Sequence, residues 1–218
     1  MFLKIGHRGA RAYETENTIQ SFKRAIDLGA NAIEFDLQRT SDGQLIVSHD
    51  DNLKRVFGQN KIIDNTPLEE LKALTSDQIP TFMEALEFID HKVEKILVEI
   101  KKIGYEAEII ARVENSGLHD RIIIVSFHEA SLAEIRKLDG RIEAGFIYTR
   151  YKNPVAAAAK LEAQYLLPLY SFTHTKNIEE AHKNGLKVLV WTVNSKEEAD
   201  KYKSKGVDGI ASDKPDIL

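Results

Sequence analysis

Short apolar runs alternate with amphipathic stretches along most of the chain. The apolar runs are rich in Ile, Val and Leu, as buried strands are, and the stretches between them repeat their apolar residues at helical spacing. The runs predict strands over residues 2–7, 31–37, 44–48, 95–100, 122–126, 144–148, 165–169, 187–193 and 209–211. The intervening pattern predicts helices over residues 16–29, 67–74, 81–89, 106–115, 131–138, 154–163, 177–184 and 196–205.

This alternation indicates parallel strands that are joined by right-handed helical crossovers. The runs 31–37 and 44–48 are separated by a turn signal, Ser41-Asp42-Gly43, and we count them as one barrel position. Eight strand positions then favour a closed (β/α)₈ barrel, compact because such barrels typically need ~250 residues. The rival is a doubly wound open sheet, which usually carries a Gly-rich turn after its first strand, and that turn is absent here. The chain ends just after the eighth strand, which leaves little room for an eighth helix.

Residues 50–80 interrupt the alternation of predicted strands and helices. They are polar, contain Pro67 and Pro80, and carry one short helical stretch over 67–74. We interpret this segment as a small inserted cap over the site, because it is too short to have a core of its own. The prediction is therefore a single domain, residues 1–218, with a cap at about 50–80.

Composition narrows the function classes. The chain has 43% hydrophobic residues, which is enough for one sizeable core. Its net charge of -4 does not suit binding to nucleic acid, which needs a basic surface. The absence of cysteine excludes disulfides, thiolate nucleophiles and Cys-based zinc sites. No run of about 18 apolar residues predicts a membrane span, and no secretion signal precedes the first motif. We expect a cytoplasmic protein; the pattern does not indicate an oligomeric state.

Two acids share one face of a predicted strand. Side chains alternate across a strand, so Glu34 and Asp36 point one way and their apolar neighbours the other. Two carboxylates that face a barrel interior repel each other unless a positive charge neutralises them. A hard divalent cation such as Mg²⁺ or Ca²⁺ takes oxygen ligands and is the natural partner. A solvated edge or an internal salt bridge is the alternative; we favour the metal because acids are rarely buried unpaired.

The strand over 95–100 repeats this pattern with Glu99 and Lys101. An apolar strand that becomes charged only at its C-terminal end is typical of a barrel active site. Glu99 could supply a third metal oxygen, and Lys101 could meet a phosphate as a point charge. A simple Glu–Lys ion pair at a strand end explains the two residues equally well.

His7 and His49 each end an apolar run. Imidazole moves protons near neutral pH, so one ring could protonate a leaving alkoxide while the other deprotonates a nucleophile. A structural role is the alternative, but two such histidines beside acids favour function. Arg8 adds a planar fork that suits phosphate oxygens. Trp191, at the end of the predicted strand over 187–193, fits a core position or a pocket wall against an apolar part of a substrate.

Taken in order, these motifs resemble those of the glycerophosphodiester phosphodiesterase family. The resemblance covers nearly the whole chain and rests on His7-Arg8-Gly9, Glu16-Asn17-Thr18, Ala32-Ile33-Glu34-Phe35-Asp36-Leu37, Thr40-Ser41-Asp42-Gly43, Val47-Ser48-His49-Asp50, Ile79-Pro80-Thr81, Val98-Glu99-Ile100-Lys101, Trp191-Thr192-Val193-Asn194 and Val207-Asp208-Gly209-Ile210. It implies a TIM-barrel hydrolase that cleaves a glycerophosphodiester, a small-molecule substrate, to glycerol 3-phosphate and an alcohol.

The resemblance also implies roles for individual residues. His7 and His49 would be the acid and base, and one divalent cation, usually Mg²⁺ or Ca²⁺, would be held by Glu34, Asp36 and Glu99. Arg8 and Lys101 would grip the phosphate. Two alternatives compete with this reading. A phosphodiesterase of lysophospholipid headgroups on the same barrel would need an apolar surface for its lipid, and a non-catalytic phosphate-binding barrel would not need two histidines and three acids.

Overall fold

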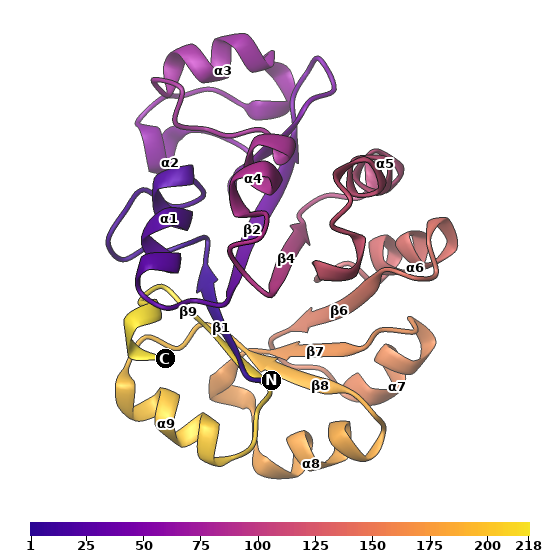
Figure 1. The fold of residues 1–218 in the computed structure, drawn as a ribbon. Helices are drawn as coiled ribbons and strands as arrows, with labels where there is room; N and C mark the ends of the chain where they lie inside the picture. Colours follow the sequence, from indigo (N-terminus) through magenta and orange to yellow (C-terminus); the bar gives the residue numbers. More distant parts are fainter.

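The computed structural model describes all 218 residues, which alternate strands with helices from end to end (Figure 1). The strands are β1 (Leu3–His7), β2 (Ala32–Arg39), β3 (Leu45–Val47), β4 (Lys95–Ile100), β5 (Ile122–Ser126), β6 (Glu143–Tyr148), β7 (Tyr165–Pro168), β8 (Lys187–Val190) and β9 (Gly209–Ser212). The α-helices are α1 (Ile19–Asp27), α2 (Lys54–Phe57), α3 (Leu68–Leu74), α4 (Phe82–Ile89), α5 (Glu106–Ser116), α6 (Glu129–Leu138), α7 (Pro154–Lys160), α8 (Thr175–Lys183) and α9 (Lys196–Ser204).

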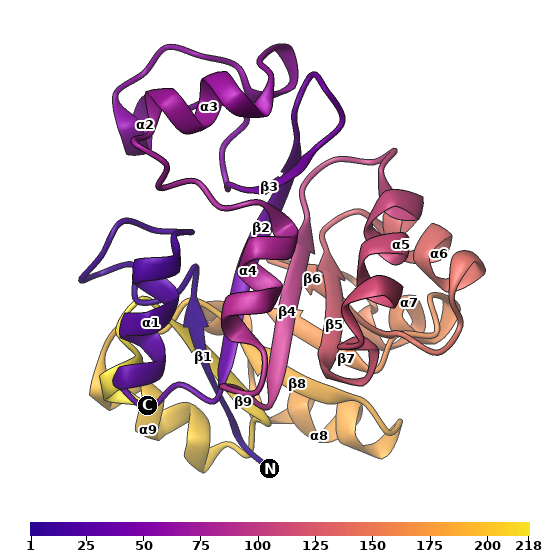
Figure 2. The same ribbon diagram turned by 45° about the horizontal axis from the view of Figure 1, so that its top comes forward.

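Eight of the strands close into a parallel barrel. Its order is β1, β2, β4, β5, β6, β7, β8 and β9, and β9 pairs back onto β1. This confirms the predicted (β/α)₈ TIM barrel and rules out the open sheet. The remaining strand, β3, pairs antiparallel with the end of β2, with Leu37 opposite Val47 (Figure 2). The two runs therefore share one barrel position as a hairpin, as expected, and only β2 belongs to the barrel wall.

Alternation along the strands builds two apolar layers. The outward-facing side chains, including Ile33, Phe35 and Leu37 of β2, join the helices in a cluster of 44 buried residues. The inward-facing side chains form a second cluster of 11 buried residues inside the barrel, which includes Leu97 and Tyr165. A site at the end of the barrel would therefore pack against this inner cluster.

Helix starts follow ordinary capping chemistry. Thr18 caps α1 by accepting a hydrogen bond from the backbone N–H of Ser21. Thr81 and Glu84 form a capping box at the start of α4. The residues after β9 form a short 3-10 turn, Pro215–Ile217. None of the helices has the length and apolar character needed to cross a membrane.

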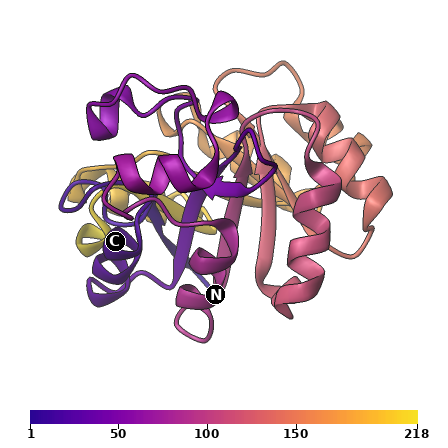
Figure 3. The ribbon, with the colours of Figure 1, turned by 90° about the horizontal axis from the view of Figure 1, so that it is seen from above.

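The segment between β3 and α4 forms a lobe beyond the ends of β2 and β3, and it contains α2 and α3 (Figure 2). In Figure 3 this purple lobe lies on the same side as the N-terminal helix and the C-terminus. The expectation that the segment is too short for a core is wrong. Side chains spaced widely along the lobe fold onto one residue of β3 to form a small buried cluster: Ile46, Leu53, Ile63, Leu71 and Ile79.

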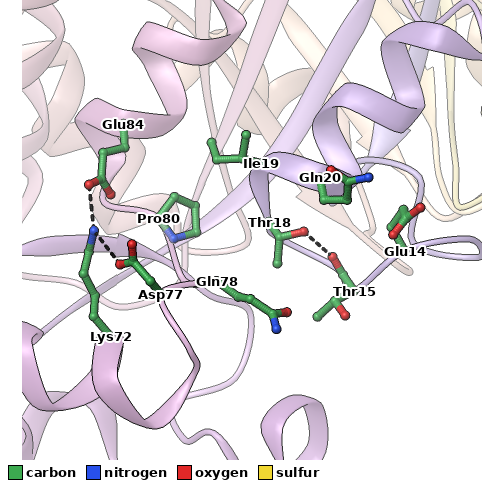
Figure 4. A pocket seen from close by; sticks show the side chains of 10 residues that line it. All are labelled: Glu14, Thr15, Thr18, Ile19, Gln20, Lys72, Asp77, Gln78, Pro80 and Glu84. Carbon is green, nitrogen blue, oxygen red and sulfur yellow. Dashed lines mark hydrogen bonds and ion pairs between the residues drawn. The ribbon is translucent and has the colours of Figure 1, made fainter.

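A polar cleft of about 530 Å³ separates the lobe from α1 and α4 (Figure 4). One side chain crosses it: the Nζ of Lys72 on α3 lies 2.6 Å from a carboxylate oxygen of Glu84 on α4. The same ammonium lies 3.2 Å from Asp77, also within the lobe. Lys72 therefore ties the lobe to the barrel on a side that holds none of the predicted site residues.

Candidate active site

The predicted site residues gather at the C-terminal ends of neighbouring strands. His7 of β1 is in register with Glu34 of β2, and Asp36 of β2 is in register with Glu99 of β4. Because the strands are parallel, all these ends meet at one rim of the barrel. This is the rim on which the active sites of such barrels are built.

Three carboxylates form a compact buried cluster there. One oxygen each from Glu34, Asp36 and Glu99 lie within 4.8 Å of one another. Asn17 donates to Asp36 Oδ2 at 2.9 Å, and the backbone N–H of Arg8 donates to Glu34 Oε2 at 2.9 Å. The other oxygens, Glu34 Oε1 and Asp36 Oδ1, are buried and accept no hydrogen bond. Buried oxygens without donors are costly, so this cluster is one that could hold a metal ion.

The electrostatics of the cluster support that reading. Burial, together with the charges of Asp36 and Glu99, raises the pKa of Glu34 well above its ordinary value. Burial and the charge of Asp36 also raise the pKa of Glu99 to about 7. For Asp36, burial acts in the same direction, but the positive charges of Arg8 and Lys101 outweigh it and lower the pKa. The protein alone thus does not neutralise the three acids, and an added cation would.

Two cations border the cluster. Arg8 donates from a terminal guanidinium nitrogen to Glu16 Oε1 at 2.9 Å, and its Nε lies 3.3 Å from Asp36 Oδ2. Lys101 lies 2.7 Å from Glu99 Oε1 and 3.4 Å from Asp36 Oδ1. The ion pair expected as the plain alternative for Glu99 and Lys101 is therefore present, but it is part of the larger cluster. Both cations lie at the rim, where a phosphate could meet them.

Arg8 is held by an unusual stretch of backbone. It has a positive φ of 54°, and Gly9 follows with a φ of 82°. A Cβ on Gly9 would collide with Ser21 of α1, so only glycine fits there. The hydroxyl of Ser21 donates to the Arg8 carbonyl at 2.9 Å. This close approach of α1 turns the Arg8 N–H toward Glu34.

Each candidate histidine is anchored through the same ring nitrogen. His7 Nδ1 lies 2.6 Å from Asp213 Oδ1, and His49 Nδ1 lies 2.6 Å from Asp50 Oδ1. Nδ1–H donation to a carboxylate leaves Nε2 as the nitrogen that can exchange a proton. His7 Nε2 faces the cluster, 4.0 Å from Glu34 Oε2. Burial lowers the pKa of His49, although the charge of Asp36 opposes this.

Sequence reasoning missed the carboxylate partners of the histidines. Asp213 follows β9, the last strand of the barrel, so its place at the C-terminal end of a strand was an available signal. Asp50 lies beside His49 in the motif, but nothing in the sequence shows that its side chain turns back to the ring. Glu16 was read only as part of a helix start, whereas it is buried and pairs with Arg8.

A cavity of about 240 Å³ opens at this rim. Six charged or titratable residues line part of it: His7, Arg8, Glu34, His49, Glu99 and Lys101. The other ten lining residues are hydrophobic and include Phe127, Leu167 and Trp191. Trp191 meets Phe127 edge-on at 5.5 Å between ring centroids, and its Nε1 donates to the Leu167 carbonyl at 2.7 Å. Trp191 therefore packs on the inner cluster and lines the cavity, while Asp36 lies fully buried beneath it.

Comparison with known proteins agrees with this arrangement. The sequence model of the glycerophosphoryl diester phosphodiesterase family matches residues 7–217. A glycerophosphodiester phosphodiesterase from Caldanaerobacter subterraneus is 35% identical over 232 residues, covering 99% of this chain and 96% of the relative.

Two solved structures are similar over nearly the full length. The glycerophosphodiester phosphodiesterase from Thermotoga maritima has 30% identity and a TM-score of 0.84, covering 100% of this chain and 97% of that one. A phosphodiesterase from Oleispira antarctica, solved in complex with the product sn-glycerol-3-phosphate, has 28% identity and a TM-score of 0.88, covering 97% and 93%. The chain therefore belongs to the glycerophosphoryl diester phosphodiesterase family and is a phosphoric diester hydrolase.

Proposed function

We propose that the protein hydrolyses glycerophosphodiesters to glycerol 3-phosphate and an alcohol, with the help of one divalent cation, Mg²⁺ or Ca²⁺. The observation that carries the proposal is the juxtaposition of two carboxylate-anchored histidines with a buried cluster of three acids. The Oleispira antarctica relative with bound sn-glycerol-3-phosphate supports the choice of product.

Glu34, Asp36 and Glu99 are the residues that would hold the cation. Their donors are all carboxylate oxygens, which is the ligand type that Mg²⁺ and Ca²⁺ prefer, and two of these oxygens are buried without a hydrogen bond. A bound cation would polarise a phosphate oxygen and offset the negative charge that develops there. Arg8 and Lys101 would add positive charge at the same rim.

His7 and His49 would move the protons. Each ring is fixed through Nδ1, so Nε2 is the atom that gives or takes a proton. One histidine protonates the departing alkoxide and the other deprotonates the nucleophile. The nucleophile is either water or the neighbouring glycerol hydroxyl, and the second route passes through a cyclic phosphate. Trapping that cyclic phosphate during turnover would exclude direct water attack as the sole route.

A second substrate class is favoured by one observation. The apolar lining of the cavity, which includes Phe127 and Trp191, could accept carbon atoms of a lipid. A lysophospholipid would then be cleaved by the same groups. Comparing turnover of glycerophosphocholine with that of lysophosphatidylcholine separates the two candidates.

The deciding experiment measures release of glycerol 3-phosphate from several glycerophosphodiesters, with and without a chelator. The proposal expects release that depends on added Mg²⁺ or Ca²⁺. Hydrolysis that is indifferent to chelation would remove the metal from the mechanism, and no release from any glycerophosphodiester would reject the substrate class.

We further propose that residues 1–218 form one domain, with residues 50–80 as a small cap beside the site. The support is that this segment reaches the rim through Asp50 and Arg55.

A cytoplasmic location is proposed on the absence of cysteine.

A further inference from the structure

A single arginine of the lobe contacts two carboxylates at the edge of the site. Arg55, in the short helix α2, donates from Nε to Asp50 Oδ2 at 2.6 Å. Its two terminal nitrogens donate to Glu16, one to Oε2 at 2.8 Å and the other to Oε1 at 2.6 Å. All three guanidinium nitrogens thus donate, with a bidentate contact on one acid and a single contact on the other.

Both carboxylates lead directly to predicted site residues. The second oxygen of Asp50 holds Nδ1 of His49 at 2.6 Å. Glu16 Oε1 also accepts from Arg8 at 2.9 Å. Arg55 is therefore the central member of an unbroken polar chain that runs from the ring of His49 to the guanidinium of Arg8.

The charges show why this chain depends on Arg55. Glu16 is buried, and burial opposes its ionisation, but hydrogen bonds from Arg55 and the charge of Arg8 lower its pKa to about 2. Asp50 has one oxygen on His49 and the other on Arg55, so both of its oxygens are fixed. Without Arg55, Asp50 would keep only one polar partner and be free to rotate away from the histidine ring.

We propose that Arg55 is a positioning residue, which sets the ring of His49 and the side chain of Arg8 in one geometry and makes that geometry depend on the docking of the lobe. This inference rests on the proposed function for the roles of His49 and Arg8. Arg55 does not line the cavity and acts only through Asp50 and Glu16. A lysine could not replace it, because one ammonium cannot span two carboxylates as the planar fork does.

The competing explanation is that Arg55 merely fastens the lobe to the barrel. The chain offers a matched control, because Lys72 also ties the lobe to the barrel, through Glu84, without touching the site (Figure 4). Removing either side chain loosens the lobe. Only removal of Arg55 leaves Asp50 with His49 as its single partner and takes the bidentate contact from Glu16, which keeps its ion pairs with Arg8 and Arg11.

The test compares wild type, R55A, R55K and K72A in steady-state release of glycerol 3-phosphate from glycerophosphocholine at saturating divalent cation. Misplacing a proton-transfer group is costly, so we expect kcat to fall by at least about tenfold in R55A and in R55K. K72A should stay within about twofold of wild type, since it leaves the polar chain intact. Guanidinium ion in the buffer should restore part of the activity of R55A and none of the activity of an H49A variant.

A second readout needs no turnover. The ring-nitrogen chemical shifts of His49, assigned by their loss in H49A, report whether the proton sits on Nδ1. We expect the Nδ1–H tautomer in wild type and K72A and a mixture of tautomers in R55A. R55K, which keeps a positive charge, decides the matter if R55A does not fold.

The outcomes separate cleanly. The positioning role is overturned if kcat in R55A and R55K is no lower than in K72A. It is also overturned if the tautomer of His49 does not change in R55A. If wild type itself does not release glycerol 3-phosphate, the proposed substrate is wrong. The comparison of His49 tautomers then still tests the positioning role of Arg55.

Discussion

Nδ1 of His7 lies 2.6 Å from Oδ1 of Asp213, although 206 positions separate the two residues in the chain. β1 and β9 are neighbours in the closed barrel, with Gly6 in register with Ser212, so barrel closure brings the two residues together. The other oxygen of Asp213 accepts from Asn194 at 2.8 Å. The carboxylate is thus fixed on both sides, and it holds the histidine with Nε2 toward the acid cluster.

Replacing Asp213 by Asn should lower kcat by about 10- to 100-fold, because an amide can present its N–H to Nδ1 and favour the wrong tautomer of His7. Steady-state kinetics of glycerol 3-phosphate release would measure the change. D208N is the control: half-buried Asp208 lies 2.8 Å from Nε2 of the exposed His182, and neither residue lines the cavity. Equal kinetics for D213N and D208N would show that the Asp213 contact is structural only.

Replacing His7 or His49 by Ala should each cost at least the ~10²-fold that loss of a general acid or base typically costs. The substitution removes the proton-carrying Nε2 and leaves the acid cluster in place. Activity is measured at saturating substrate, with H182A as a variant of an exposed histidine. If both variants kept wild-type kcat, the acid–base assignment would be wrong.

The barrel and the core of the site could be predicted because they follow from local rules. Strand alternation alone put Glu34 and Asp36 on one face, and the same rule put Glu99 and Lys101 on one face of another strand. The structure adds the register, which sets Asp36 beside Glu99. These positions needed only the period of a strand and the rule that parallel strands end at a common rim.

The carboxylate anchors could not be predicted in the same way. The contacts of Asp50 and Arg55 depend on how the lobe folds, and the lobe has no regular period. Its small core comes from single apolar residues far apart in sequence, such as Leu53 and Ile79, which meet only after the chain has turned back. The contact of His7 with Asp213 needed closure of the whole barrel.

Glu34 offers a test of the metal site that does not require turnover. In the metal-free protein its charge is opposed by burial and by two neighbouring acids, so E34Q should leave thermal stability unchanged or raise it. Mg²⁺ or Ca²⁺ should raise the melting temperature of chelator-treated wild type by mass action, because the ion binds only the folded site. E34Q should lose most of that rise.

Thermal melts with and without the ion check this expectation. E108Q serves as the control, since Glu108 pairs with Arg39 and belongs neither to the acid cluster nor to the cavity lining. An ion-dependent rise in E34Q as large as in wild type would exclude Glu34 as a ligand.

Glu16 should make folding stability depend on acid pH. Its folded pKa is about 2, against an ordinary value of 4.5, because the contacts with Arg55 and Arg8 outweigh burial. A group whose pKa is depressed by folding contributes stability that is fully present above its unfolded pKa and is lost as pH falls through the folded value. The contribution should thus be complete above pH 4.5 and fade toward pH 2. Its size should be about 2 kcal/mol after allowance for solvent screening. Urea unfolding of wild type and E16Q measures this contribution. The difference between their unfolding free energies should be constant near neutral pH and should disappear in acid. A difference that does not change with pH would mean that the Glu16 contacts act by packing and not by charge.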